Sequence, residues 1–245
     1  GAASSQADAS SPERPPLGRR RTSLRDIVMP PTPPEAGGGG GAAEAPAKLL
    51  LVSDPGQDLD DEMALIMLRY LASHGRAEPL GVVAPLAPAF DRARLARGTL
   101  DLLGLSGVPV ATGTDGGDAA GAHTAEPFAE SAAYYMPPLR SAATEKLWTG
   151  RRLFHRLYRE AAPRSLTLVV LASMKDPALF VRDNEALFKA KTREVVLMGG
   201  VLPWNDDDGA AAAAADGGGG RARALLKPDS ANNNTFCMAS AEFLY

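Results

Sequence analysis

The sequence predicts an α/β protein with a mainly parallel sheet and helices on both of its faces. Short apolar runs recur between residues 48 and 198, and each has the length of a buried strand. Longer amphipathic segments separate these runs, as the crossover connections of parallel strands require. With 245 residues, of which 45% are hydrophobic, the chain is long enough to bury one core.

The elements alternate in order along the chain. The strands are expected at the apolar runs 48–53, 80–84, 108–112, 166–172 and 194–198. Between them, leucine-rich amphipathic stretches predict helices at 61–73, 91–104, 145–161 and 177–189. A long polar and aromatic loop separates the third strand from the third helix. This regular alternation favours one sheet of parallel strands.

Two segments differ in composition from the predicted domain, which spans 48–245. Residues 1–47 contain eight prolines and the glycine run 37–41, so they cannot bury enough apolar surface to fold, and we expect a disordered tail. Residues 205–224 consist largely of Asp, Ala and Gly. We expect this stretch to be a low-complexity surface insertion.

The composition argues against several kinds of partner and location. A net charge of −3 and a pI near 5.7 provide no basic surface for nucleic acid. No apolar run approaches the roughly 18 residues of a membrane helix. Cys237 is the single cysteine, which suggests a reducing compartment. We therefore expect an intracellular, cytoplasmic protein with a small-molecule partner, although the basic run 19–23 leaves organelle targeting open.

The most informative feature is an acidic cluster directly after the first predicted strand. Five carboxylates fall within residues 54–62. The strand's carboxyl end and the next helix's amino end meet here, and ligands bind at this edge of open parallel sheets. Four of the acids (Asp54, Asp58, Asp60 and Asp61) could surround a hard cation such as Ca²⁺ or Mg²⁺. A water bound to that cation would be acidified, with a carboxylate beside it to take the proton.

A purely structural interpretation explains part of the cluster. Pro55-Gly56 would form a turn, Asp60 would cap the helix, and Asp61 and Glu62 would complement the positive helix end. It does not explain why Asp54 and Asp58 are also acidic. We therefore favour a cation site.

The order of four motifs resembles the inosine/uridine-preferring nucleoside hydrolase family. The first is Asp54-Pro55-Gly56 followed by Asp60-Asp61, with two more intervening residues than the family has. The others are the Gly-Val-Pro at 107–109, the strand that ends in Met-Gly-Gly at 198–200, and the segment 232–241, which begins with three asparagines. The resemblance covers about 48–245.

This resemblance implies Ca²⁺-dependent hydrolysis of the N-glycosidic bond of ribonucleosides. It implies that Asp54 holds the metal and accepts a proton from the attacking water. Asp61 would chelate the metal, and Asp60 would lie between the metal and the ribose hydroxyls. A main-chain carbonyl at Leu171 or its neighbour Ala172 would be a further ligand. Ribose contacts would come from Met198 and from one of Asn233 and Asn234.

Two alternatives stay open. The family has an Asp where this chain has Val52, and its last metal-binding Asp and leaving-group His lie beyond the point matching Tyr245. We therefore expect an incomplete C-terminus, and a related protein that binds its ligand without turnover is the first alternative. The second is a Mg²⁺-dependent phosphoryl-transfer enzyme, although Gly56 stands where such phosphatases have an acid. Base preference is not predicted, and a homo-oligomer stays open.

Overall fold

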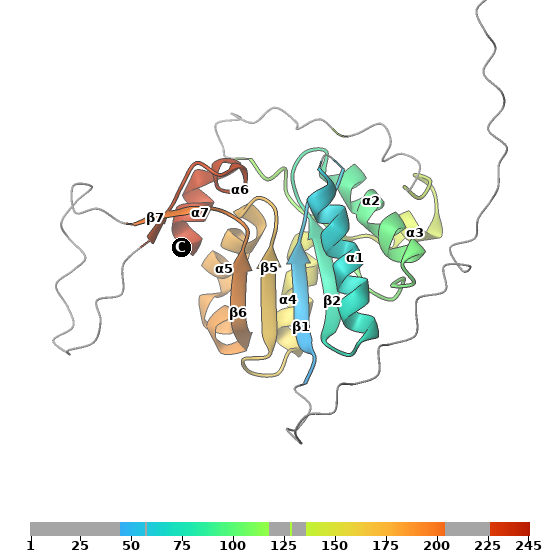
Figure 1. The fold of residues 1–245 in the computed structure, drawn as a ribbon, viewed down its shortest axis with the longest axis horizontal. Helices are drawn as coiled ribbons and strands as arrows, with labels where there is room; N and C mark the ends of the chain where they lie inside the picture. The colour runs from blue at the N-terminus through green and yellow to red at the C-terminus, as the bar shows by residue number, and fades with distance from the viewer. Residues whose placement is uncertain (1–44, 57, 118–127, 129–135, 204–225) are drawn as a thin grey trace, which may run out of the picture. The chain divides into compact units, whose positions relative to one another are not determined.

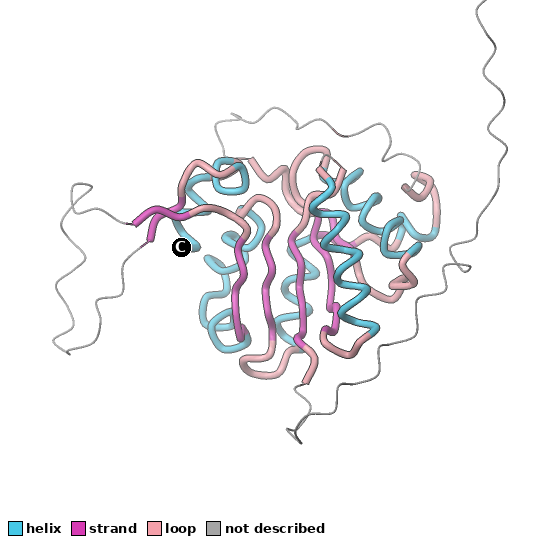
Figure 2. The backbone as a smooth tube through the Cα atoms, viewed as in Figure 1, coloured by secondary structure: helices cyan, strands magenta, loops and turns pink. Residues whose placement is uncertain are grey.

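A computed structural model describes residues 45–56, 58–117, 128, 136–203 and 226–245. Its main feature is a six-stranded sheet in the order β4-β3-β2-β1-β5-β6. Every pairing within this sheet is parallel, and Figure 2 shows its central strands running side by side. The strands are β1 (Ala47–Val52), β2 (Ala77–Ala84), β3 (Val110–Thr112), β4 (Trp148–Thr149), β5 (Leu166–Val170) and β6 (Thr192–Leu197). The predicted fold class is confirmed.

Helices cover both faces of the sheet. The longer ones are α1 (Leu59–Ser73), α2 (Ala89–Leu102), α4 (Gly150–Glu160) and α5 (Lys175–Lys191). The short α3 (Ala142–Glu145) precedes β4, and α6 (Asn232–Thr235) and α7 (Met238–Leu244) follow a separate antiparallel hairpin of β7 (Val201–Pro203) and β8 (Leu226–Pro228). Figure 1 shows α1 on the viewer's side of the sheet and α4 behind it.

The alternation of side chains along the central strands builds two cores. Leu50 and Val52 of β1 pack with α4 and α5, through side chains such as Phe154 and Phe180. Leu51, which points the other way, packs with α1 and α2. Because both faces of the central strands are buried, their sequences are continuously apolar, and this is why the runs were easy to identify.

The predicted boundaries differ from the structure mainly around the long loop. The predicted helix 145–161 begins only at Gly150, because Trp148 and Thr149 form β4 and the Thr149 side chain then accepts a hydrogen bond from the Arg152 amide. The strand predicted at 108–112 begins at Val110. The hairpin β7–β8 and the helices α6 and α7 were not predicted.

Two predictions concern residues outside the described part. The tail at 1–47 lies outside it except for 45–47, and Ala47 already belongs to β1. The insertion at 205–224 lies wholly outside it. Among the described helices, none is both long and apolar enough to cross a membrane.

Candidate functional site

The acidic turn lies between the end of β1 and the start of α1, as predicted. It contributes Asp54, Asp58, Asp60 and Asp61 to a cavity of about 480 Å³. Gly56 has a φ of +119°, and a Cβ there would clash with the Phe128 ring. Glycine is therefore required for this turn.

Two hydrogen bonds join the Asp61 side chain to the residues that follow β1. Its Oδ1 accepts from the Ser53 hydroxyl at 2.5 Å and from the Asp54 amide at 3.1 Å. The purely structural interpretation, in which Asp60 caps the helix, is wrong on this point. The cap position is Asp58, which makes no side-chain capping bond, and Asp60 Oδ1 instead accepts from the amide of its neighbour Asp61 at 3.1 Å. Helix capping therefore does not explain why the turn is so acidic.

The carboxyl groups of Asp54 and Asp61 have raised pKa values. Burial raises the pKa of Asp54 to about 7, and the negative charge of Asp61 adds to the shift. The pKa of Asp61 is raised to about 6, first by burial and then by Asp60, while the Ser53 hydrogen bond opposes the rise. Negative charge is thus crowded into a poorly solvated place. A cation, or a ligand that donates hydrogen bonds, would relieve this crowding.

Arg92 is a buried cation beside the acidic turn, and no sequence pattern predicted its role. Its side chain is fully buried, and Nη1 donates to the carbonyls of Asp54 at 2.6 Å and Pro55 at 3.2 Å. Its charge also opposes the rise in the pKa of Asp54. Arg92 therefore fixes the backbone of the turn and offsets part of its charge. Because it lies on α2, 38 residues from Asp54, no local motif could have revealed it.

The opposite wall of the cavity comes from the ends of β5 and β6 and from α6. Three of its lining residues are Leu171, Met198 and Asn233, which the resemblance had named as a metal ligand and ribose contacts. Asn233 Nδ2 donates to the carbonyls of Leu171 at 2.8 Å and Met198 at 2.9 Å. One amide therefore ties α6 to both strand ends and lies beside the carbonyl that was predicted to be a metal ligand.

Asn234 differs from its neighbour. It is fully buried, and its Nδ2 donates to the carbonyl of Gly200 at 2.9 Å and to Asp229 Oδ1 at 3.1 Å. It does not line the cavity. Of the two predicted ribose contacts, the structure therefore places Asn233 at the cavity and Asn234 in the support behind it.

The donor set has the chemistry of a hard-cation site, because carboxylates and a carbonyl line one cavity. In the part of the chain that the structure describes, however, no group of three or more His, Cys, Asp or Glu side chains is placed to hold a metal ion. Asp54, Asp60 and Asp61 share the cavity without converging on one point. The calcium site therefore stays a prediction.

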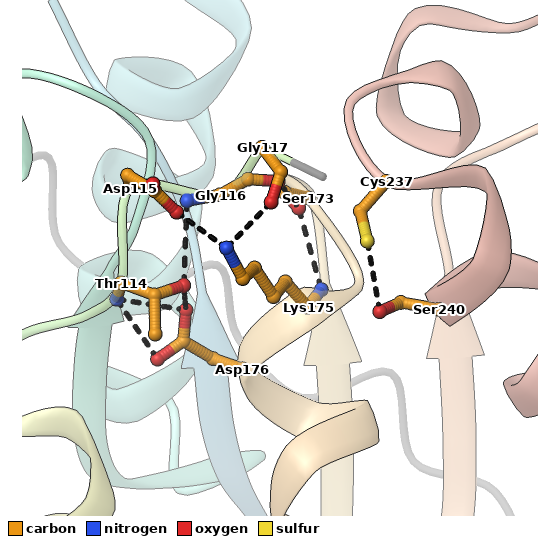
Figure 3. A network of polar contacts seen from close by, with 9 residues as sticks. All are labelled: Thr114, Asp115, Gly116, Gly117, Ser173, Lys175, Asp176, Cys237 and Ser240. Atoms are coloured by element: carbon orange, nitrogen blue, oxygen red, sulfur yellow. Dashed lines mark hydrogen bonds and ion pairs between the residues drawn. The ribbon is translucent and has the colours of Figure 1, made fainter. Parts of the chain in front are cut away.

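A network of polar contacts, here called the clamp, joins the segment after β3 to the start of α5 (Figure 3). Asp176 accepts from the Thr114 hydroxyl at 2.6 Å and from its amide at 3.0 Å. Lys175 Nζ contacts Asp115 Oδ1 at 2.6 Å, and the Ser173 hydroxyl donates to the carbonyl of Gly116 at 2.5 Å. These bonds fix the turn after β5, whose first residue is Leu171.

A larger cavity of about 670 Å³ lies around Trp148. Two of its acids, Asp101 and Glu160, form ion pairs with Arg97 and Arg156. Two of its three carboxylates are therefore paired with arginines of their own helices. We place the candidate site in the smaller cavity, where the acids are crowded.

Solved structures share this fold. A crystal structure of the type III effector protein XopQ, complexed with adenosine diphosphate ribose, matches 82% of the chain at 26% identity and a TM-score of 0.65. The effector protein XOO4466 matches 82% at 24% identity and a TM-score of 0.63. A purine-preferring ribonucleoside hydrolase from Gardnerella vaginalis matches 80% at 18% identity and a TM-score of 0.52.

The chain spans only about half the length of these proteins, covering 53%, 52% and 57% of them. No protein-family model matches the sequence, and no curated protein does. The fold is that of nucleoside hydrolases and of the two effector proteins. At this level of identity, the hydrolase match concerns the fold and not the reaction.

Proposed function

We propose that the cavity binds the ribose of a ribonucleoside and that the chain hydrolyses the N-glycosidic bond with the help of Ca²⁺. One observation carries the proposal. Residues from four separate segments that the resemblance had named (Asp54, Asp60 and Asp61, then Leu171, then Met198, then Asn233) line a single cavity. Chance would rarely bring such a set together at the ligand-binding edge of a parallel sheet.

The residues divide the chemistry between them. Asp54, Asp60, Asp61 and the Leu171 carbonyl would hold the cation, which supplies Lewis-acid activation of the attacking water. The raised pKa of Asp54 suits a group that takes a proton near neutral pH. Nearby carboxylates stabilise the positive charge that develops on the sugar as the bond to the base breaks. Met198 and Asn233 face the ribose from the other wall.

A second function has specific support. XopQ, the effector complexed with adenosine diphosphate ribose, matches at 26% identity, and Val52 is fully buried at the place of a family Asp. A protein that binds a riboside without cleaving it is therefore the alternative. In both functions the ligand is a small molecule that contains ribose.

The experiment that separates the two functions measures binding and turnover on the same protein. Isothermal titration with inosine, uridine and adenosine diphosphate ribose is run with Ca²⁺ and with EDTA, beside an assay for released ribose. Ribose release that EDTA abolishes supports the hydrolase. Binding without release supports the second function, and the absence of both contradicts the ribose site. Release of phosphate from a phosphomonoester would favour the Mg²⁺-dependent alternative instead.

A further inference from the structure

One carboxylate, Asp229, contacts α6 at two points. It lies between β8 and α6, and its Oδ1 accepts from the Ala231 amide at 2.8 Å and from Asn234 Nδ2 at 3.1 Å. The first bond spans two residues and closes an Asx turn, which sets the direction in which the chain enters the helix. The second bond holds Asn234, the buried residue of α6. Asp229 therefore contacts both the start of α6 and its buried side.

The same carboxylate segment also joins α6 to the link between β6 and β7. The Asp229 amide donates to the carbonyl of Gly200 at 3.0 Å, and Asn234 Nδ2 donates to the same carbonyl at 2.9 Å. Gly200 directly follows Met198 and Gly199, which both line the cavity of the candidate site. Asp229 and Asn234 thus connect α6 to the segment that forms part of the cavity wall.

Two glycines make room for this contact. A Cβ on Gly199 would lie 2.6 Å from Asn234 Oδ1, and a Cβ on Gly200 would overlap the Asp229 carboxylate. Neither glycine has a positive φ. The need for glycine therefore comes from the close approach of the two side chains and not from the backbone conformation. The link after β6 is shaped to receive Asp229 and Asn234.

Asn233 depends on contacts from outside its own helix. Helix α6 has only four residues, and so short a helix is not stable through its own hydrogen bonds. Asn233 nevertheless reaches the carbonyls of Leu171 and Met198 at 2.8 and 2.9 Å. Asp229 does not line the cavity, so any effect that it has on the cavity passes through α6.

We propose that Asp229 is a positioning residue, which holds α6 so that Asn233 is presented to the ribose. The inference rests on the proposed function, in which Asn233 contacts the ligand. Asp229 acts through the geometry of an acceptor oxygen and not through its charge. A shift of about 1 Å in a contacting group is enough to weaken a site, and a supporting residue prevents such a shift.

Isothermal titration with inosine tests whether Asp229 acts through Asn233. We expect Asp229→Ala and Asn233→Ala each to weaken binding about three- to tenfold, the net value of one hydrogen bond to the ligand. The double variant should bind no more weakly than Asn233→Ala alone. Glu194→Ala, which removes an exposed acid from β6, is the control and should bind like the wild type. Additive losses, or wild-type binding by Asp229→Ala, overturn the proposal.

Two further variants separate position from charge. Asp229→Asn keeps an acceptor oxygen for Ala231 and Asn234 and should retain most of the binding. Gly200→Ala should weaken binding, because its Cβ displaces the Asp229 carboxylate, but it should cause no further loss in the Asp229→Ala background. Binding by Asp229→Asn that is as weak as that of Asp229→Ala would show that the charge matters, and would contradict positioning.

Hydrogen exchange measures the positioning without any ligand. Asp229→Ala removes the acceptor of the Ala231 amide, so the amides of 231–236 should exchange about tenfold faster. Those of α5 should keep their rates and control for global unfolding. Unchanged exchange in α6 overturns the proposal. A wild-type chain that binds no nucleoside contradicts the proposed function instead, and exchange in α6 then decides the positioning alone.

Discussion

Two carboxylates of this protein, Asp61 and Asp176, are each only 7% exposed, yet their surroundings differ. Both lie in the first turn of a helix that follows a parallel strand, and burial is the largest cause of a raised pKa in both. Asp176 is paired with the amide and hydroxyl of Thr114 and lies beside Lys175. Asp61 also accepts two hydrogen bonds, but Asp60 raises its pKa and Asp61 in turn raises the pKa of Asp54.

This difference indicates that Asp176 has a structural role, whereas Asp61 belongs to a site suited to binding a ligand. The bonds to Asp176 are complete within the protein and join two segments that must stay together. The charge around Asp61 is left partly unbalanced, because Arg92 is the one cation among the described residues that opposes the raised pKa values of Asp54 and Asp61. A fold tolerates such repulsion where binding relieves it.

The largest expected effect separates the two sites by activity. If the chain hydrolyses nucleosides, Asp54→Asn removes the group that accepts the proton, and ribose release should fall about 10²- to 10⁴-fold. Asp176→Asn keeps the size of the side chain and lies outside the acidic turn, so release should stay within about tenfold of the wild type. Initial rates at saturating nucleoside and Ca²⁺ measure both. Equal losses of ribose release in the two variants would contradict the distinction between a functional Asp54 and a structural Asp176.

Arg92 offers the next test, because it contacts the acidic turn from helix α2. Arg92→Met leaves the buried carbonyls of Asp54 and Pro55 without their donor. We expect the free energy of unfolding to fall by about 3–5 kcal/mol, because two buried carbonyls lose their donor and the buried carboxylates of Asp54 and Asp61 lose a neighbouring cation. Urea denaturation measures this loss.

The control for Arg92 is Arg94→Met on the same helix. Arg94 is also buried, but it bonds to Pro137 and Asp91, away from the acidic turn. Both substitutions should destabilise the protein, whereas only Arg92→Met should weaken nucleoside binding, as measured by titration. Equal nucleoside binding by the two variants would contradict a role for Arg92 in the site.

The same contrast explains how far the sequence could predict the structure. Apolar strands and the acidic turn are local patterns, so the parallel sheet and Asp54, Asp60 and Asp61 could be predicted. Met198 and Asn233 were found through family motifs. The contacts of Arg92 and of the Asp176 clamp could not be predicted. Their partners lie 38 and 62 residues away in the sequence, and only the fold brings them together.

The sequence also could not predict which of two adjacent asparagines reaches the cavity. In the short helix α6, Asn233 and Asn234 point in different directions, because successive residues are about 100° apart around a helix. Only the position of α6 against β5 and β6 decides which of them reaches the cavity.

A smaller effect is expected at the structural acid itself. Asp176→Ala removes the acceptor for the Thr114 amide and hydroxyl, so the free energy of unfolding should fall by about 2–4 kcal/mol, reflecting buried donors left unpaired. Thr114→Val removes only the hydroxyl donor and should cost about 1 kcal/mol. Thermal or urea unfolding measures both. If Asp176→Ala unfolds like the wild type, the clamp does not hold the two segments together.

The smallest effect has the opposite sign and concerns stability against pH without metal. The pKa of Asp54 is raised from 3.8 to about 7 in the folded protein, by burial first and by Asp61 next. Between these values the folded chain holds a proton that the unfolded chain has released. Stability therefore falls as pH rises through this window, because the ionised form is disfavoured only in the folded state.

Asp54→Asn removes that ionisation. In EDTA we expect the variant to be more stable than the wild type by about 1–3 kcal/mol at pH 8, with the gain disappearing towards pH 4. Urea denaturation at several pH values measures the difference, and Asp58→Asn, at an exposed position of the same turn, controls for the loss of a surface charge. A variant that is less stable than the wild type at pH 8 would mean that Asp54 stabilises the fold, as Asp176 does, and the contrast between the two sites would disappear.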